Sequence, residues 1–111
     1  MLIVYVHGSK GTYSFVAEKN GEIFKIGIFK KVGITPYQAK YLAIREVLKI
    51  FPKSELLIYC DSKFILNQLE KEIEIRNRKL KLLVNDINRR MTKKIKIKWI
   101  PTYQNKARKI F

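Results

Sequence analysis

An apolar run that ends in a carboxylate constrains the fold of this 111-residue chain more than any other segment. Residues 55–60 read Glu-Leu-Leu-Ile-Tyr-Cys, which predicts a strand buried on both faces, and Asp61-Ser62 follows it directly. The stretch from Ser62 to about Lys71 is predicted to be helical. In a mixed α/β sheet, a strand followed at once by a helix places its carboxyl-terminal tip where chemistry is usually found. Asp61 is therefore the first candidate functional residue.

The first half of the chain predicts three antiparallel strands and a helix. Residues 1–6 are apolar and precede a turn-rich segment at residues 7–11. Residues 13–19 and 22–32 flank Asn20-Gly21, the strongest short signal for a β-hairpin. Thr35 is a suitable N-cap and Pro36 a suitable first residue for a helix that Pro52 ends.

The second half predicts a further helix and strand. Residues 78–91 carry an apolar stripe at helical spacing, whereas residues 70–74 are ambiguous between a helix end and a connection. Residues 93–100 alternate lysine with Ile95, Ile97 and Trp99, which indicates a half-buried strand. This alternation favours Trp99 in the core over Trp99 as a base-stacking residue. Residues 104–111 allow at most two helical turns. The order βββαβααβα predicts one α/β domain over residues 1–111, with parallel strands joined by right-handed crossovers.

Positive charge sets this chain apart from an average globular domain. It has 24 Lys and Arg against 9 Asp and Glu, a net charge of +15 and a pI near 10.1. Residues 76–111 hold 13 basic residues and one acid, Asp86, and charge that served solubility alone would not segregate in this way. The distribution indicates a polyanionic partner, of which nucleic acid is the commonest.

The candidate nucleic-acid contacts share exposure on the predicted final helix and strand, or lie in the segment after them. The apolar stripe of the helix forces its basic residues outward, and the strand adds its lysines, so several elements together suit the phosphates of a duplex. Tyr103 is a stacking candidate. The alternative is a merely solvated charged face. The full set is Arg76, Arg78, Lys79, Lys81, Arg89, Arg90, Lys93, Lys94, Lys96, Lys98, Tyr103 and Arg108.

Cysteine content and hydropathy bear on the compartment. The single cysteine, Cys60, lies in the apolar strand and is expected to be a buried small side chain in a reducing compartment. The sequence contains no apolar run long enough for a membrane span, and residues 1–6 read as a strand rather than a signal peptide. A cytoplasmic protein without a membrane partner is expected.

Four local motifs, taken in order along the chain, resemble those of the ribonuclease H family. They are Val6-His7-Gly8-Ser9, the segment from Thr35 through Lys40 to Ile44, Tyr59-Cys60-Asp61-Ser62, and Trp99-Ile100-Pro101 followed by Asn105 and Ala107-Arg108. The resemblance covers essentially the whole chain. It implies a mixed five-stranded sheet with helices on both faces.

The resemblance also implies that the catalytic site of this chain has degenerated. Family members use four carboxylates and two divalent ions to cleave the RNA strand of an RNA–DNA hybrid, and the matching positions here are His7, Lys40, Asp61 and Arg108. Only Asp61 is an acid, and a fixed cation in a ligand shell repels a metal ion. Neither a metal nor another cofactor is therefore expected. Asp61 is interpreted as an ion-pair partner of Lys40 or Arg108, or as a former metal ligand. His7 is interpreted as a polar turn residue or a general base.

Three functions remain open at this point. The first is a non-catalytic protein that recognises duplex RNA or RNA–DNA hybrid by backbone charge and shape. The second is a basic structural component of a ribonucleoprotein such as the ribosome, in contact with rRNA. The third is a residual metal-dependent nuclease with its site rebuilt around His7 and Asp61. The sequence leaves the oligomeric state open.

Overall fold

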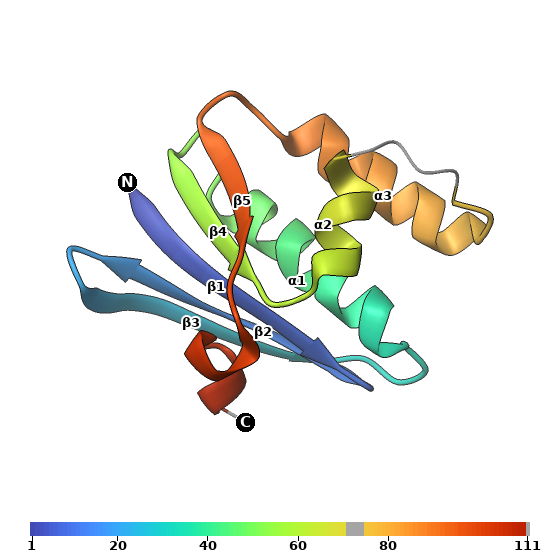
Figure 1. The fold of residues 1–111 in the computed structure, drawn as a ribbon, viewed down its shortest axis with the longest axis horizontal. Coiled ribbons are helices and arrows are strands. Elements are labelled where there is room, and N and C mark those ends of the chain that lie inside the picture. Colours follow the sequence, from blue (N-terminus) through green and yellow to red (C-terminus); the bar gives the residue numbers. More distant parts are fainter. Residues whose placement is uncertain (71–74, 111) are drawn as a thin grey trace.

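A mixed five-stranded sheet organises the protein (Figure 1). The computed structural model describes residues 1–70 and 75–110. The strands are β1 (Leu2–Ser9), β2 (Thr12–Lys19), β3 (Glu22–Lys30), β4 (Leu56–Cys60) and β5 (Ile95–Trp99), in the spatial order β3-β2-β1-β4-β5. The pairs β1–β2 and β2–β3 are antiparallel, and the pairs β1–β4 and β4–β5 are parallel. The predicted fold class is confirmed.

Local signals in the sequence explain where the hairpin and the helices begin. Asn20 and Gly21 both have positive φ, 54° and 80°, as a tight hairpin turn requires. The helix α1 (Pro36–Ile50) begins with a capping box, in which Thr35 and Gln38 each accept a hydrogen bond from the backbone of the other. α2 (Lys63–Glu70) follows Asp61-Ser62 as predicted, and Asn77 caps α3 (Arg78–Arg90).

The three α-helices cover one face of the sheet (Figure 1). Side chains that alternate along the strands, among them Val4, Phe15 and Ile58, form the core with buried residues of the helices. The opposite face carries two short 3-10 turns, at Thr102–Gln104 and Arg108–Ile110. Helical structure therefore lies on both faces, but the last element is a pair of 3-10 turns and not an α-helix.

Two predictions about the strands were wrong, and long-range pairing explains the first. His7, Gly8 and Ser9 continue β1 instead of forming a turn, because they pair with residues 12–14 of β2. β4 is fully buried on the helix side only. The α-helices of the described residues lie on that side, and on the other face Leu57 and Tyr59 are half-buried. Of residues 70–74, Glu70 ends α2, and residues 71–74 lie outside the described part of the chain.

Two further expectations concern Cys60 and membrane spans. Cys60 is buried as predicted, and this burial raises the pKa of its thiol to about 11. At neutral pH the thiol is therefore protonated and serves as a small packing group. In the described part of the chain, no helix is both long enough and apolar enough to cross a membrane.

Candidate functional site

The tips of β1 and β4 bring His7 and Asp61 together. Because the strands are parallel and in register, with Val6 opposite Cys60, the next residue of each strand lies at the same edge of the sheet. His7 Nδ1 lies 3.7 Å from Asp61 Oδ2. Two of the four residues that the resemblance marked are thus neighbours.

Gly8 allows α1 to approach this edge closely. A Cβ atom at Gly8 would lie 2.5 Å from the backbone carbonyl carbon of Ala39 and would also overlap the backbone nitrogen of Lys40. Glycine therefore lets the first turns of α1 contact β1 directly. The half-buried Lys40 is held near enough to Asp61 for its positive charge to act on the carboxylate.

Asn105 is the residue that completes this edge, and the sequence analysis assigned it no role. Its side chain is fully buried, and Nδ2 donates to the carbonyl of Val6 at 2.9 Å and to Asp61 Oδ2 at 3.1 Å. Its Oδ1 accepts a hydrogen bond from the backbone N–H of Ala107 at 3.0 Å. We call His7, Lys40, Asp61 and Asn105 the strand-tip site.

The predicted ion pair of Asp61 with Lys40 or Arg108 is not formed. Among the described residues, the ion-pair contact of Asp61 within 4.0 Å is with His7. Arg108 is exposed on the second 3-10 turn, because the C-terminal turns direct Asn105 inward and Arg108 outward. The sequence did contain the signal for this arrangement, since Asn105 belongs to the C-terminal motif that supports the resemblance.

The C-terminal turns are anchored to the open face of the sheet. Lys106 Nζ lies 2.6 Å from Glu18 Oε2, and it also lies 5.5 Å from the centre of the Tyr5 ring. Ser14 Oγ donates to the carbonyl of Ala107 at 3.2 Å. These contacts hold the segment that carries Asn105 against β1 and β2.

The electrostatics of the strand-tip site favour a charged Asp61. Burial alone would raise the pKa of this carboxyl group, but the hydrogen bond and electrostatic contact with His7, the hydrogen bond from Asn105 and the positive charge of Lys40 outweigh burial. The pKa of Asp61 therefore lies below its ordinary value of 3.8. In the folded protein Asp61 is a stable anion that contacts His7 and Asn105 and lies in the field of Lys40.

A depressed pKa in the folded state links Asp61 to acid stability. The stabilisation is fully present above the unfolded-state pKa of about 3.8 and is lost as the pH falls through the lower folded-state pKa. We expect the free energy of unfolding of Asp61→Asn to decline less steeply below about pH 4 than that of the wild type. Urea unfolding at successive pH values measures this. Equal slopes for the two proteins would show that the carboxylate is not stabilised.

The strand-tip site does not fit the two-metal centre of ribonucleases H. Two divalent ions need several acidic ligands to offset their charge, whereas this edge supplies one carboxylate, one imidazole and the charge of Lys40. Within residues 1–70 and 75–110, no three or more His, Cys, Asp or Glu side chains gather in a group that could hold a metal ion.

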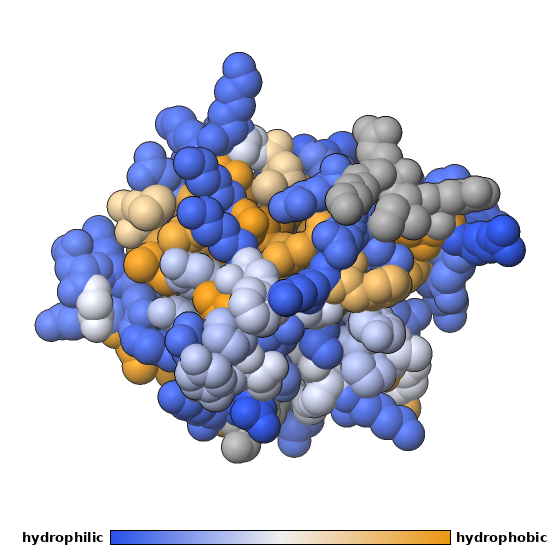
Figure 2. Space-filling model, in the orientation of Figure 1, coloured by the Kyte–Doolittle hydropathy of each residue, from blue (hydrophilic) through white to orange (hydrophobic). Residues whose placement is uncertain are grey.

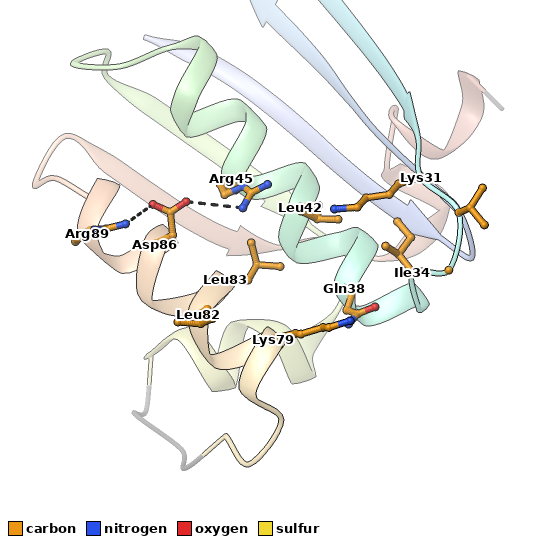
Figure 3. Close-up of a pocket in the computed structure, with 12 residues that line it drawn as sticks. Lys31, Ile34, Gln38, Leu42, Arg45, Lys79, Leu82, Leu83, Asp86 and Arg89 are labelled. Atoms are coloured by element: carbon orange, nitrogen blue, oxygen red, sulfur yellow. Dashed lines mark hydrogen bonds and ion pairs between the residues drawn. The ribbon is translucent and has the colours of Figure 1, made fainter.

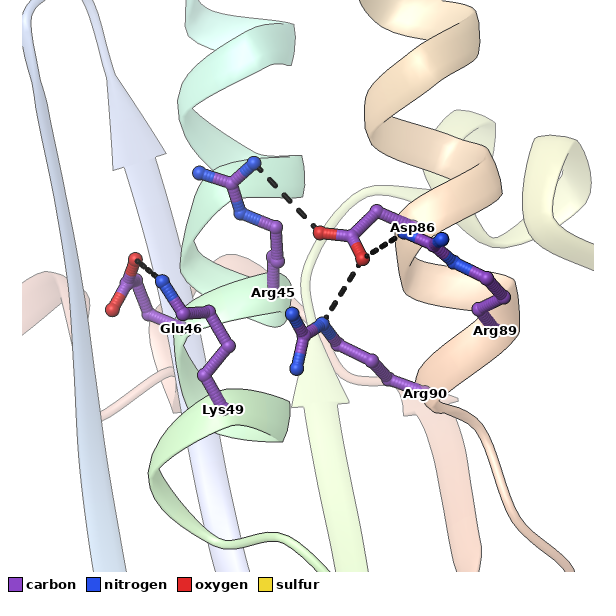
Figure 4. A network of polar contacts seen from close by, with 6 residues as sticks. All are labelled: Arg45, Glu46, Lys49, Asp86, Arg89 and Arg90. Atoms are coloured by element: carbon purple, nitrogen blue, oxygen red, sulfur yellow. Dashed lines mark hydrogen bonds and ion pairs between the residues drawn. The ribbon is translucent and has the colours of Figure 1, made fainter.

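Three other acids of the described chain, Glu18, Glu46 and Asp86, are engaged elsewhere. Glu46 lies 3.8 Å from Lys49 on α1, and Glu18 pairs with Lys106. Asp86 accepts hydrogen bonds from Arg89 and Arg90 and faces Arg45 across the helix interface at 3.9 Å (Figure 4). None of these carboxylates lies in the strand-tip site.

The predicted nucleic-acid contacts divide into three groups. The basic residues of α3 are exposed on the helix side of the sheet, with Arg76 just before them and Lys93 and Lys94 just after. Lys96 and Lys98 point to the opposite face, because Ile95 and Ile97 turn toward the helices. Tyr103 and Arg108 are exposed on the C-terminal turns. In the view of Figure 2, hydrophilic residues likewise surround apolar areas instead of gathering on one side.

A basic groove runs between α1, α3 and the segment before α1 (Figure 3). Its volume is about 580 Å³, and its charged lining comprises Lys31, Arg45, Lys79, Arg89 and a single acid, Asp86. Ile34, Leu42 and Leu83 form part of its apolar lining. The net positive lining gives α3 and α1 together a place for an anionic group.

The prediction that Trp99 lies in the core was wrong. Trp99 follows the alternation of β5, but 41% of its surface is exposed, because β5 is an edge strand that α2 covers only in part. Lys63 Nζ lies 4.4 Å from the centre of its indole ring. Tyr103, the predicted stacking residue, is 69% exposed.

The sequence places the chain in a known family. A family model described as reverse transcriptase-like matches residues 14–110. The chain belongs to this family. The matched segment of this reverse transcriptase-like protein includes Lys40, Asp61, Asn105 and Arg108, and it begins after His7. No curated protein sequence matches the chain.

Solved structures identify the fold as that of ribonucleases H. The N-terminal RNase H domain of a Mycobacterium tuberculosis protein superposes with a TM-score of 0.84 at 15% identity, over 97% of this chain and 88% of that one. RNase H1 of Halobacterium salinarum gives 0.83 at 20% identity, over 96% and 89%. A compost-derived RNase H1 in complex with an RNA/DNA hybrid gives 0.78 at 17% identity, over 98% and 92%.

Proposed function

We propose that this reverse transcriptase-like protein is a non-catalytic member of the ribonuclease H-like proteins that binds duplex RNA or RNA–DNA hybrid. The observation that carries the proposal is the strand-tip site, where Asp61 is engaged by Asn105 and His7 and lies in the field of Lys40. One carboxylate among these donors and cations binds two divalent ions poorly. The same positive field favours a phosphate close to this edge of the sheet.

The basic surfaces support nucleic acid as the partner. The exposed cations of α3 and the groove between α1 and α3 extend over several elements, as contacts to a phosphate backbone require. The compost-derived RNase H1 of the same fold is in complex with an RNA/DNA hybrid. We extend to this chain a preference for duplexes with RNA-like shape, read through the backbone and not through base sequence.

Titrations with three duplexes of one sequence test the proposal. We expect fluorescence anisotropy to show tighter binding to RNA–DNA hybrid or double-stranded RNA than to double-stranded DNA, with a steep dependence on salt. Weak binding that is equal for all three duplexes and gone at about 200 mM salt would instead favour a structural component of a ribonucleoprotein. Co-sedimentation with a ribosomal subunit through stringent washes would point the same way.

Charge-neutral variants locate the surface. Lys79→Gln with Lys81→Gln removes two exposed cations from α3, and we expect the slope of log affinity against log salt to fall by about two. Lys19→Gln with Lys25→Gln removes the same charge from the exposed β2–β3 hairpin and is the matched control. If both pairs lower the slope equally, binding follows net charge and α3 has no special role.

A further inference from the structure

A hollow between the end of β5 and α2 combines features that the duplex surface does not use. Its volume is about 360 Å³. Trp99, Ile97 and Lys98 contribute from β5, and Lys63, Leu66, Asn67 and Glu70 contribute from α2. Among the described residues, the side chains that face the hollow thus include the indole of Trp99, the amide of Asn67, the ammonium group of Lys63 and the carboxylate of Glu70. Lys98 borders the hollow through its place on β5, while its side chain points to the opposite face of the sheet.

The indole is the central element of this hollow. Trp99 is the one tryptophan of the chain, and it stays 41% exposed although Ile95 on the same face of β5 is buried. Lys63 Nζ lies 4.4 Å from the ring centre, which is the distance of a cation–π contact. A half-exposed aromatic ring next to a cation is an arrangement on which unpaired bases stack in single-strand-binding proteins.

We propose that the hollow binds an unpaired nucleobase of a single-stranded nucleic acid, stacked on Trp99. The exposed amide of Asn67 donates to or accepts from the edge of the base, and Lys63 contacts a neighbouring phosphate. This proposal rests on the proposed function, since it assumes a nucleic-acid partner. It adds that the partner has an unpaired segment, which duplex binding alone does not require.

Two further exposed aromatic residues lie at the N-terminal ends of α2 and α1. Trp99 pairs in register with Cys60, one residue before Asp61. Phe64 and Tyr37 are about half exposed at the N-terminal ends of α2 and α1, and their rings lie 5.1 Å apart. Each of these aromatic groups has a lysine beside it: Lys40 Nζ lies 5.9 Å from the Tyr37 ring, and Lys63, which contacts Trp99, directly precedes Phe64.

The fluorescence emission of Trp99, the single tryptophan, reports directly on binding at this site. Titration of the protein with a 12-nucleotide oligouridylate or oligothymidylate is expected to quench Trp99 emission to a saturable level, because a stacked base contacts the indole. A blunt duplex of equal length, at the same occupancy measured by anisotropy, is expected to quench less. Bound single strand with unchanged tryptophan emission would overturn the proposal.

Variants separate this site from the duplex surface. We expect Trp99→Leu to weaken single-strand binding about tenfold, Trp99→Phe to weaken it less because phenylalanine still stacks, and neither to change duplex affinity. Asn67→Ala is expected to weaken single-strand binding. Asn85→Ala, which replaces an exposed asparagine on α3, is its control. Thermal unfolding confirms that each variant is folded.

The outcomes distinguish the two proposals. If the protein binds duplex, and Trp99→Leu and Asn67→Ala bind single strand as tightly as the wild type does, the base-binding role of the hollow is contradicted and the proposed function is not. Absence of binding to any nucleic acid would overturn the proposed function and the hollow with it. Displacement of single strand by poly-glutamate, without base-dependent quenching, would assign the hollow to an acidic protein segment and would likewise contradict the proposal.

Discussion

Gly8→Ala is expected to lower the free energy of unfolding by more than about 3 kcal/mol. The new methyl group would lie 2.5 Å from the backbone carbonyl carbon of Ala39, and backbone atoms cannot move aside as a flexible side chain can. α1 must then withdraw from β1, which disturbs the buried face of the helix and moves Lys40 away from Asp61. Chemical denaturation measures the loss of stability.

Gly33→Ala is the matched control for this prediction. Gly33 has φ of 84° and an open surrounding, so alanine there meets an unfavourable backbone conformation but no steric overlap. We expect a cost of about 1 kcal/mol. If Gly8→Ala costs no more than Gly33→Ala, the close contact between β1 and α1 is not what requires glycine.

Asn105→Ala is expected to destabilise the fold by about 3 kcal/mol, which corresponds to a fall in Tm on the order of 10 °C. The substitution removes three hydrogen bonds and leaves the carbonyl of Val6 and the N–H of Ala107 without this partner in a buried place. It also frees the C-terminal turns and takes a donor from Asp61. Thermal unfolding followed by circular dichroism measures the effect.

The neighbouring exposed residue provides the control for Asn105. Gln104 donates one exposed side-chain hydrogen bond, to Tyr103, and Gln104→Ala is expected to change stability by less than about 0.5 kcal/mol. A similar small effect for Asn105→Ala would mean that the buried amide does not hold the C-terminal turns in place.

The elements that the sequence predicted well are those with strong local signals. Asn20-Gly21 specifies the hairpin because both residues must adopt positive φ, and Thr35-Pro36 specifies the start of α1 through its capping groups. The apolar run before Asp61 placed the carboxylate at a strand tip, where the structure has it.

The features that the sequence missed depend on contacts between distant residues. Asn105 and Arg108 lie three positions apart, and only the path of two 3-10 turns decides which of them reaches Asp61. Trp99 obeys the strand alternation, yet its exposure depends on how far α2 extends over an edge strand. The burial of Glu18 likewise depends on Lys106, which lies 88 residues away.

We propose that this ribonuclease H-like fold binds nucleic acid without cleaving it. Catalysis depends on the strand-tip site, where Asp61 is one anion beside His7, Asn105 and Lys40. Binding depends on a broad surface, because the cations of α3 and of the groove beside α1 are spread over several elements.

One measurement tests directly whether the protein binds the hybrid and whether it cleaves it. An RNA–DNA hybrid labelled at the end of its RNA strand is mixed with the protein in Mn²⁺, and the anisotropy of the label is followed over time. We predict an immediate rise that stays constant for hours and reverses with added salt, because the protein binds the hybrid and does not cut it. Absence of a rise would contradict binding, and a rise followed by decay to the value of a short fragment, absent in Asp61→Asn, would contradict the loss of catalysis.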